Sequence, residues 1–283
     1  METGNQPTRY DYPMLSASLE RTVTITGNGL FSGEPCRAEV RPAEPGTGIV
    51  FIREGVRIPA TVGQYIEQPN CSILGVGDTH IAVTEHILAA LWAAGIDQTE
   101  IEVTGPELPN QDGSAKPMYD ALMDGGRETF GPRELLPLEK GFAVKRGNQA
   151  SLEILPGAEL CIAYGFIHRE LGRQDFVAEA DREWAAQNIL PARTFITEHE
   201  ALAARGAGIL RNTDETAALL IRDGQPARPL RFDNEYARHK VLDLIGDLYV
   251  LPWELTGNIV GALSGHAMNR EMARQLAKLA PSE

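Results

Sequence analysis

"RHKVLDLIGD", residues 238–247, places His239, Asp243 and Asp247 four residues apart inside an otherwise apolar run. Side chains at this spacing share one face of an α-helix, so the stretch predicts a helix with an imidazole and two carboxylates in a row. That row is either the solvated face of an amphipathic helix or part of a site. The stretch alone leaves both interpretations open, and partners from elsewhere in the chain must decide.

The composition is that of a globular protein with a substantial core. The chain has 283 residues, of which 43% are hydrophobic and 23% charged, which predicts one large domain or two of ordinary size. We see neither an apolar run of membrane-spanning length nor a secretory signal, so we expect no transmembrane segment and a cytoplasmic protein. The formal net charge of −13 argues against nucleic acid as the main partner, whereas a small anionic substrate needs only a local cluster of cations.

The chain divides into two mixed α/β halves around a segment rich in glycine and proline at 125–141, which we expect to be a linker. In the first half, a helix with Glu85 and His86 leads to a strand, a loop and a second helix. The second half repeats this order from the helix with His239 to the loop with His266. Two such domains packed face to face would bring these polar residues into one cleft. The alternative is that this order is simply common in α/β chains.

Three cysteines without a C-x-x-C pair argue against a disulfide framework and against a thiolate zinc site. Any metal would therefore be held by histidine and carboxylate. His86 alone reads as a structural histidine, with Glu85 as a favourable anion in the first turn of its helix. Together with His239 and Asp243, however, it completes the two-histidine, one-carboxylate set of a catalytic zinc. Glu85 is then the neighbouring candidate for a general base.

Five separated motifs now carry a family resemblance: "TEHILAALWAAGID", "PELPNQDGSAKP", "PARTF", "RHKVLDLIGDL" and "SGHAMN". In this order they resemble the UDP-3-O-acyl-N-acetylglucosamine deacetylases, zinc amidases of lipid A biosynthesis. The resemblance implies an α+β fold, with two pseudo-symmetric α/β-layer domains packed as a β-α-α-β sandwich and the active site between the helix layers. It implies an N-terminal domain at 16–126 with an insert near 48–78, and a C-terminal domain at 138–283 with an insert near 195–231.

The resemblance assigns the Zn²⁺ ligands to His86, His239 and Asp243, a set that also suits Fe²⁺. It implies that Glu85 and the metal activate water for attack on the acetamide carbonyl. His266 would stabilise the oxyanion and protonate the departing amine.

The same resemblance assigns supporting roles around these groups. Asp247 would orient His266 and favour its protonated form, and the Thr194 hydroxyl would help to hold the oxyanion. Lys240 is similar to the family lysine that contacts the substrate phosphates, and Phe195 and Leu30 would line the passage for the acyl chain. An ordinary strand threonine, a solvated lysine and plain core packing are the alternatives for these residues.

The chain departs from the family pattern at two positions. Phe31, in "GLFSG", stands where the family often has histidine, and Leu263, in "GALSGH", stands where lysine is common. Both departures put acyl-chain choice and nucleotide affinity in doubt, and not the metal chemistry. The loosely matching segment 161–176 leaves the contacts to uracil and sugar unassigned, and Asp112 is expected to have a structural or supporting role.

The expected partner is a UDP-linked acylated amino sugar, bound by a monomer that, ending at Glu283, lacks the dehydratase domain fused in some relatives. Two other classes remain open. One is a zinc amidohydrolase that acts on a different N-acyl substrate. The other is a non-catalytic binding relative, which loss of the base or the general acid would mark, and here both Glu85 and His266 are present.

Overall fold

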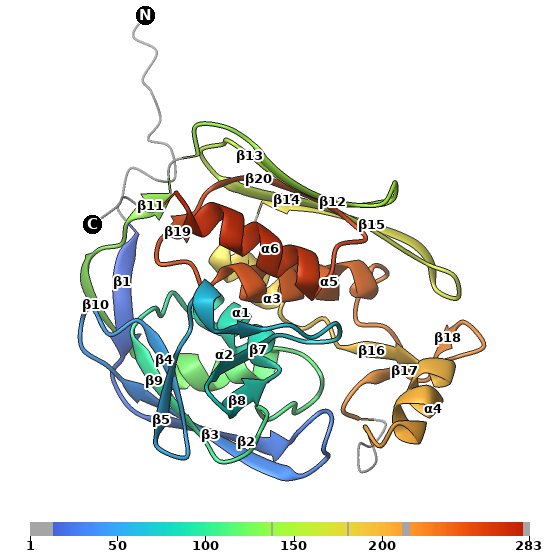
Figure 1. The fold of residues 1–283 in the computed structure, drawn as a ribbon, viewed down its shortest axis with the longest axis horizontal. Helices are drawn as coiled ribbons and strands as arrows, with labels where there is room; N and C mark the ends of the chain where they lie inside the picture. Colours follow the sequence, from blue (N-terminus) through green and yellow to red (C-terminus); the bar gives the residue numbers. More distant parts are fainter. Residues whose placement is uncertain (1–13, 137, 180, 211–215, 280–283) are drawn as a thin grey trace, which may run out of the picture.

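The computed structural model describes residues 14–136, 138–179, 181–210 and 216–279. Two five-stranded sheets form its outer layers, and helices fill the space between them (Figure 1). This is an α+β fold of the β-α-α-β kind. None of the helices in the described ranges is both long and apolar enough to cross a membrane.

The two large sheets share one topology. The first has the order β2 (Val23–Asn28), β3 (Pro35–Pro42), β9 (Thr99–Val103), β4 (Ile49–Arg53), β5 (Val56–Pro59). The second has the order β12 (Phe142–Arg146), β13 (Ala150–Leu155), β20 (Gly257–Ala262), β14 (Leu160–His168), β15 (Gly172–Glu179). In each, all neighbours are antiparallel except the third and fourth strands, β9 with β4 and β20 with β14. The chain therefore uses one architecture twice.

Alternation along the strands explains how each sheet turns one face inward. In β3, Cys36, Ala38 and Val40 are buried, while the intervening charged side chains face outward. On that outer face Arg41 pairs with Glu39 and with Glu102 of β9. An antiparallel sheet with one packed and one solvated face has this pattern.

The helices form the inner layers. In Figure 1, α1 (Thr84–Ala94) and α2 (Lys116–Asp124) lie against the first sheet, and α5 (Glu235–Leu248) and α6 (His266–Ala277) lie beneath the second, with the short α3 (Arg182–Asn188) beside them. All residues of α1 are buried. A helix that is covered on every side in this way lies between layers, and α1 packs on α5 at the centre of the molecule.

Two small three-stranded sheets extend the halves. In the first half, β6 (Tyr65–Ile66), β7 (Ile73–Val76) and β8 (Thr79–Ala82) follow a short 3₁₀ turn at Val62–Gln64. In the second, β16 (Phe195–Thr197), β17 (Leu219–Arg222) and β18 (Gln225–Pro226) accompany α4 (Glu198–Gly206) at one side of the molecule (Figure 1).

The second small sheet lies within the expected insert at 195–231. The expected insert near 48–78 fits less well, because β4 and β5 within it belong to the five-stranded sheet. We therefore propose the narrower segment 62–82 as the first insert, and we keep the domain ranges 16–126 and 138–283 as proposals.

The expected linker at 125–141 contains two strands. β10 (Arg127–Pro132) pairs with β1 (Leu15–Leu19), and β11 (Leu135–Leu136) pairs with β19 (Glu254–Leu255). The connecting segment is thus paired with a strand of the first half through β10 and with a strand of the second half through β11.

Candidate metal centre and active site

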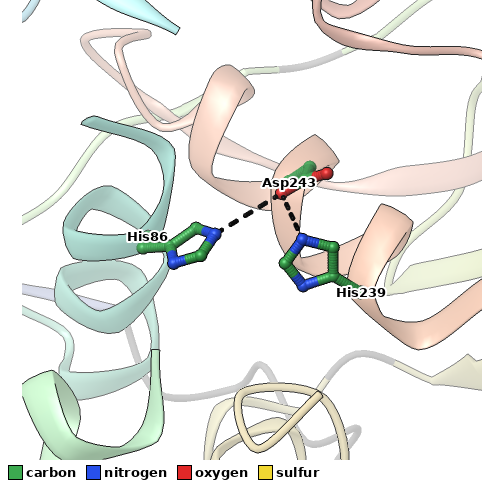
Figure 2. Close-up of side chains that lie close together, drawn as sticks. All are labelled: His86, His239 and Asp243. Carbon is green, nitrogen blue, oxygen red and sulfur yellow. Dashed lines mark ion pairs between the residues drawn. The ribbon is translucent and has the colours of Figure 1, made fainter. Parts of the chain in front are cut away.

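Three buried side chains converge where α1 meets α5. Figure 2 shows His86 of α1 pointing toward His239 and Asp243, which lie one turn apart on α5. Oδ1 of Asp243 lies 3.4 Å from Nε2 of His239 and 3.8 Å from Nε2 of His86. The three residues form a group whose ligand atoms all lie within 4.8 Å of one another.

The geometry and protonation of this group fit a divalent metal ion. Donor atoms around a tetrahedral zinc with bonds of about 2.0–2.1 Å lie about 3.3 Å apart, close to the spacing here. Oδ1 of Asp243 is buried and has no hydrogen-bond partner among the described residues. Nδ1 of His239 lies 3.1 Å from the carbonyl oxygen of Ala192, a contact that assigns its proton to Nδ1 and leaves the Nε2 lone pair facing the centre.

The electrostatics keep these donors in the form that binds a metal. Burial lowers the pKa of His86 to about 3, the facing His239 adds to the fall, and burial also lowers the pKa of His239. Both imidazoles are therefore neutral near pH 7. Burial would raise the pKa of Asp243, but His239 and Lys240 outweigh it and hold this pKa well below its usual range. Two neutral imidazoles and one carboxylate are thus available.

Glu85 and His266 form an acid–base pair beside this group. Oε1 of Glu85 lies 3.8 Å from Nε2 of His266, and Nδ1 of His266 lies 2.9 Å from Oδ2 of Asp247. Burial raises the pKa of Glu85 to about 7, against the opposing effect of His266. Burial alone would lower the pKa of His266, but Asp247 outweighs it and the pKa rises to about 9. Near neutral pH the imidazole is therefore protonated, and the glutamate can exchange a proton.

Thr194 stands over the two histidines. Its hydroxyl lies 3.4 Å from Nε2 of His86 and 3.3 Å from Nε2 of His239. Its backbone N–H donates to the carbonyl of Gly113 in the first half, and its own carbonyl accepts from Leu219 in the second, both at 2.7 Å. Contacts from both halves therefore hold Thr194 in place.

Close contact between α1 and α5 depends on a glycine. A Cβ on Gly246 would lie 2.0 Å from the carbonyl oxygen of Glu85. Only a residue without a side chain lets α5 approach the first turn of α1 so closely. The chain enters that turn through Val83, whose φ of 61° is in the left-handed region that β-branched residues rarely adopt.

A cavity of about 590 Å³ opens from these groups. Its lining includes nine of the ten predicted site residues: Leu30, Glu85, His86, Thr194, Phe195, His239, Lys240, Asp243 and His266. The tenth, Asp247, is fully buried behind His266. The structure therefore brings all ten into one place.

One wall of the cavity is apolar and is built by both halves. Leu30, Val83 and Leu210 belong to a small hydrophobic cluster separate from the main core, and Phe31 packs against it. The N–H of Leu210 donates to the carbonyl of Phe31 at 2.9 Å. Phe31, the residue that departs from the family pattern, is thus part of the wall, whereas Leu263 lies in the turn before α6 with a φ of 50°.

Lys240 lines this cavity next to Asp243. Its Nζ is 2.9 Å from Oδ2 of Asp243 and 5.6 Å from the ring centre of Phe195. Asp112, by contrast, lies away from the cavity, where it pairs with Arg231 at 2.7 Å and accepts from Ser114. The contacts with Arg231 and Ser114 therefore give Asp112 a structural role.

Three residues of the site were not predicted from the sequence. Asn269 donates to Oδ2 of Asp247 at 2.8 Å, Ser72 contacts both Glu85 and Asp247, and Gly246 admits the helix contact. The position of Asn269, three residues after His266 on α6, is a signal that could have found it. Ser72 has no such signal, because its partners are distant in the sequence.

Comparisons with known proteins agree in pointing to one family. The model of the family LpxC, described as UDP-3-O-acyl N-acetylglycosamine deacetylase, matches residues 16–278. The chain is 33% identical to the UDP-3-O-acyl-N-acetylglucosamine deacetylase of Myxococcus xanthus (strain DK1622), over 92% of this chain and 85% of the relative. It is 32% identical to the enzyme of that name from Leptospira biflexa serovar Patoc, over 91% and 88%. A bifunctional enzyme LpxC/FabZ from Chlorobaculum tepidum is 31% identical over 93% of this chain, which spans 64% of that longer protein.

Proposed function

The chain belongs to the LpxC family of UDP-3-O-acyl N-acetylglycosamine deacetylases, and we propose that it hydrolyses the acetamide of UDP-3-O-acyl-N-acetylglucosamine. The products are UDP-3-O-acyl-glucosamine and acetate, in a step of lipid A biosynthesis. The observation that carries the proposal is the convergence of the ligand set with an ionisable Glu85 and a protonated His266 at one end of a partly apolar cavity.

The family is metal-dependent, and we propose that His86, His239 and Asp243 hold Zn²⁺. Fe²⁺ suits the same ligands, and the metal content of the purified protein tests the choice. When bound, the metal polarises the acetamide carbonyl and lowers the pKa of a water molecule.

The side chains of the site supply the proton transfers. The N–H of Ser72 binds Oε2 of Glu85 at 3.0 Å, so Oε1 is the oxygen that faces the reacting centre and accepts the proton of the attacking water. His266 stabilises the developing oxyanion and then gives its Nε2 proton to the departing amine. The Thr194 hydroxyl is a second fixed donor for that oxyanion.

The remaining lining residues suit the rest of the substrate. Lys240 keeps its proton because Asp243 outweighs the effect of burial on its pKa, so it offers a positive charge to a substrate phosphate. Phe195 and Leu30 lie on apolar parts of the cavity that suit an acyl chain. We further propose a monomer in the cytoplasm, a reducing compartment that suits the three free cysteines.

Acetate release tests the proposal. Purified protein with a measured metal content should release acetate from UDP-3-O-acyl-N-acetylglucosamine, and the Glu85→Gln variant should not. Release from another N-acyl substrate alone would favour the amidohydrolase alternative. No release from any N-acyl substrate by metal-loaded protein would favour the binding relative, against which the presence of both Glu85 and His266 argues.

A further inference from the structure

Ser72, in the loop between β6 and β7, is a fully buried serine that the proposed reaction does not use directly. All its polar groups have partners. Its N–H donates to Oε2 of Glu85 at 3.0 Å, and its hydroxyl donates to Oδ1 of Asp247. Its carbonyl accepts from the N–H of Thr84 at 3.2 Å. One residue thus contacts both the base and the carboxylate that supports the acid.

The hydroxyl completes the hydrogen bonding of Asp247. Oδ2 of this carboxylate contacts Nδ1 of His266 at 2.9 Å and accepts from Nδ2 of Asn269 at 2.8 Å. Oδ1 contacts the Ser72 hydroxyl on the opposite side. Because Asp247 is fully buried, no bulk water replaces a lost donor.

We propose that Ser72 is a positioning residue that fixes Asp247, and through it His266, relative to Glu85. The inference rests on the proposed function. With one N–H and one hydroxyl, Ser72 sets the orientation of two carboxylates, so that Oε1 of Glu85 and Nε2 of His266 face the same reacting centre. Ser72 comes from the first half, whereas Asp247 and His266 come from the second. The orientation of the His266 imidazole therefore depends on contact between the two halves of the chain.

Substitution of the hydroxyl separates this role from that of the backbone. Ser72→Ala removes the donor to Asp247 but keeps the N–H that binds Glu85. We expect kcat to fall by about 10- to 100-fold, the effect of losing one hydrogen bond to a buried charge, with KM within about twofold and metal content unchanged. Ser72→Thr keeps a hydroxyl and should recover most of kcat.

Ser16→Ala is the matched control. The Ser16 hydroxyl also donates to an aspartate, Asp97, at 2.9 Å, but at β1 and away from the cavity. This variant should keep the wild-type kcat. An Ala substitution at Ser72 that leaves kcat unchanged, in folded protein with full metal content, would overturn the proposal.

A double-mutant cycle tests whether Ser72 acts through Asp247. In the Asp247→Asn background, adding Ser72→Ala should lower kcat by less than about threefold, because the group that the hydroxyl positions has already changed. Equal losses in the two backgrounds would show a separate, structural effect of Ser72 and overturn the proposal.

Nuclear magnetic resonance of the metal-loaded protein gives a readout that does not depend on the substrate. The His266 Nδ1–H resonance should shift in Ser72→Ala and stay in place in Ser16→Ala. An unmoved resonance in Ser72→Ala overturns the positioning role even if acetate release is observed. A shifted resonance in a protein that deacetylates nothing would instead retain the positioning contact and reject the proposed function.

Discussion

Single side chains set the protonation pattern of the site. Burial raises the pKa of Glu85 and lowers the pKa of His86, so that it favours the neutral form of each side chain. Asp247 raises the pKa of the equally buried His266 and keeps it charged. This pattern suits the roles proposed for the four groups, with His86 as a neutral metal ligand, Asp247 as the carboxylate that supports His266, Glu85 as the base and His266 as the acid. Each assignment has a consequence that substitution can test.

The ligand assignment predicts joint loss of metal and activity. His86→Ala, His239→Ala or Asp243→Ala should each abolish tight metal binding and turnover, because a three-ligand site without one ligand loses geometry and affinity together. Elemental analysis measures the metal. The control is His199→Ala, which changes an exposed histidine and should keep the full metal content. A ligand variant with stoichiometric metal and near-normal activity would disprove the assignment.

The two raised pKa values predict a bell-shaped dependence of kcat/KM on pH. Activity should rise as pH passes about 7, where Glu85 ionises and can accept a proton. It should fall as pH passes about 9, where His266 loses the proton that it must donate. Asp247→Asn should move the basic limb to lower pH, because the imidazolium loses a stabilising anion.

Substitution assigns the limbs of this profile. Glu85→Gln and His266→Gln should each lower kcat/KM by about 10²- to 10⁴-fold with metal retained, the second with a flattened basic limb. A basic limb that keeps its position in both His266→Gln and Asp247→Asn would remove His266 as the general acid.

Lys240 should act on binding more than on chemistry. Lys240→Ala should raise KM for the UDP-linked substrate more than it lowers kcat, because a phosphate is equally charged in the ground and transition states. Lys240→Arg, which keeps the charge, should lose less. Steady-state kinetics measure both, with Lys116→Ala, which changes a partly exposed lysine of α2 paired with Asp120, as control. A loss confined to kcat would place the charge at the reacting centre.

At the scale of elements, the helices that carry the site were predictable because their signals are local. The apolar spacing around His86 and His239 predicts α1 and α5, and both helices are present. Glycine and proline hide the alternation of β10, and its pairing with β1 is a long-range contact, so the sequence predicts a linker where the structure has a strand. For the same reason, the sequence does not point to Ser72, whose partners come from α1 and α5.

Gly246 provides an element-scale prediction. Gly246→Ala should destabilise the protein by about 1–3 kcal/mol or more, because the new methyl group would overlap the backbone of Glu85 and force α1 and α5 apart. Activity should fall with stability, since Glu85 and His86 sit on the displaced turn. Urea unfolding and kcat/KM measure the two effects.

Gly206→Ala is the control for this change. Gly206 ends α4, and a Cβ there would have no atom of the described residues within 4 Å, so the substitution should leave stability unchanged or raise it by up to about 1 kcal/mol. A Gly246→Ala protein as stable and active as wild type would show that the helix contact tolerates a side chain.

At the scale of the whole molecule, one architecture is used twice but contributes to a single candidate ligand set. His86 comes from the first half, and His239 and Asp243 come from the second. The main hydrophobic core runs through both halves without a break. The halves therefore form the candidate site only together, so we expect the contacts that join them to matter for function even where they lie far from the candidate metal centre.

A buried ion cluster around Glu254 makes one of these joints. Its Oε2 lies 2.7 Å from Arg182 of α3 and 3.1 Å from Arg133 of the connecting segment. Its Oε1 accepts from the indole N–H of Trp92 on α1 at 3.1 Å. Arg133 also pairs with Asp97, whose Oδ2 lies 3.5 Å from its Nε, whereas among the described residues Glu254 is the one carboxylate that pairs with Arg182.

Loss of the Glu254 carboxylate should lower the stability of the whole molecule and leave catalytic activity nearly unchanged. Glu254→Gln should lower the free energy of unfolding by about 1–3 kcal/mol, because it leaves Arg182 without its carboxylate partner and Arg133 with Asp97 as its remaining one. Because one core spans both halves, urea unfolding should remain a single transition at a lower midpoint, and kcat/KM in native buffer should change by less than about twofold. The control is Glu198→Gln, which removes the partner of Arg222 from a half-exposed ion pair and should cost less than about 1 kcal/mol. Two separate transitions in Glu254→Gln would show instead that the halves unfold independently, and an unchanged midpoint would show that the cluster does not hold them together.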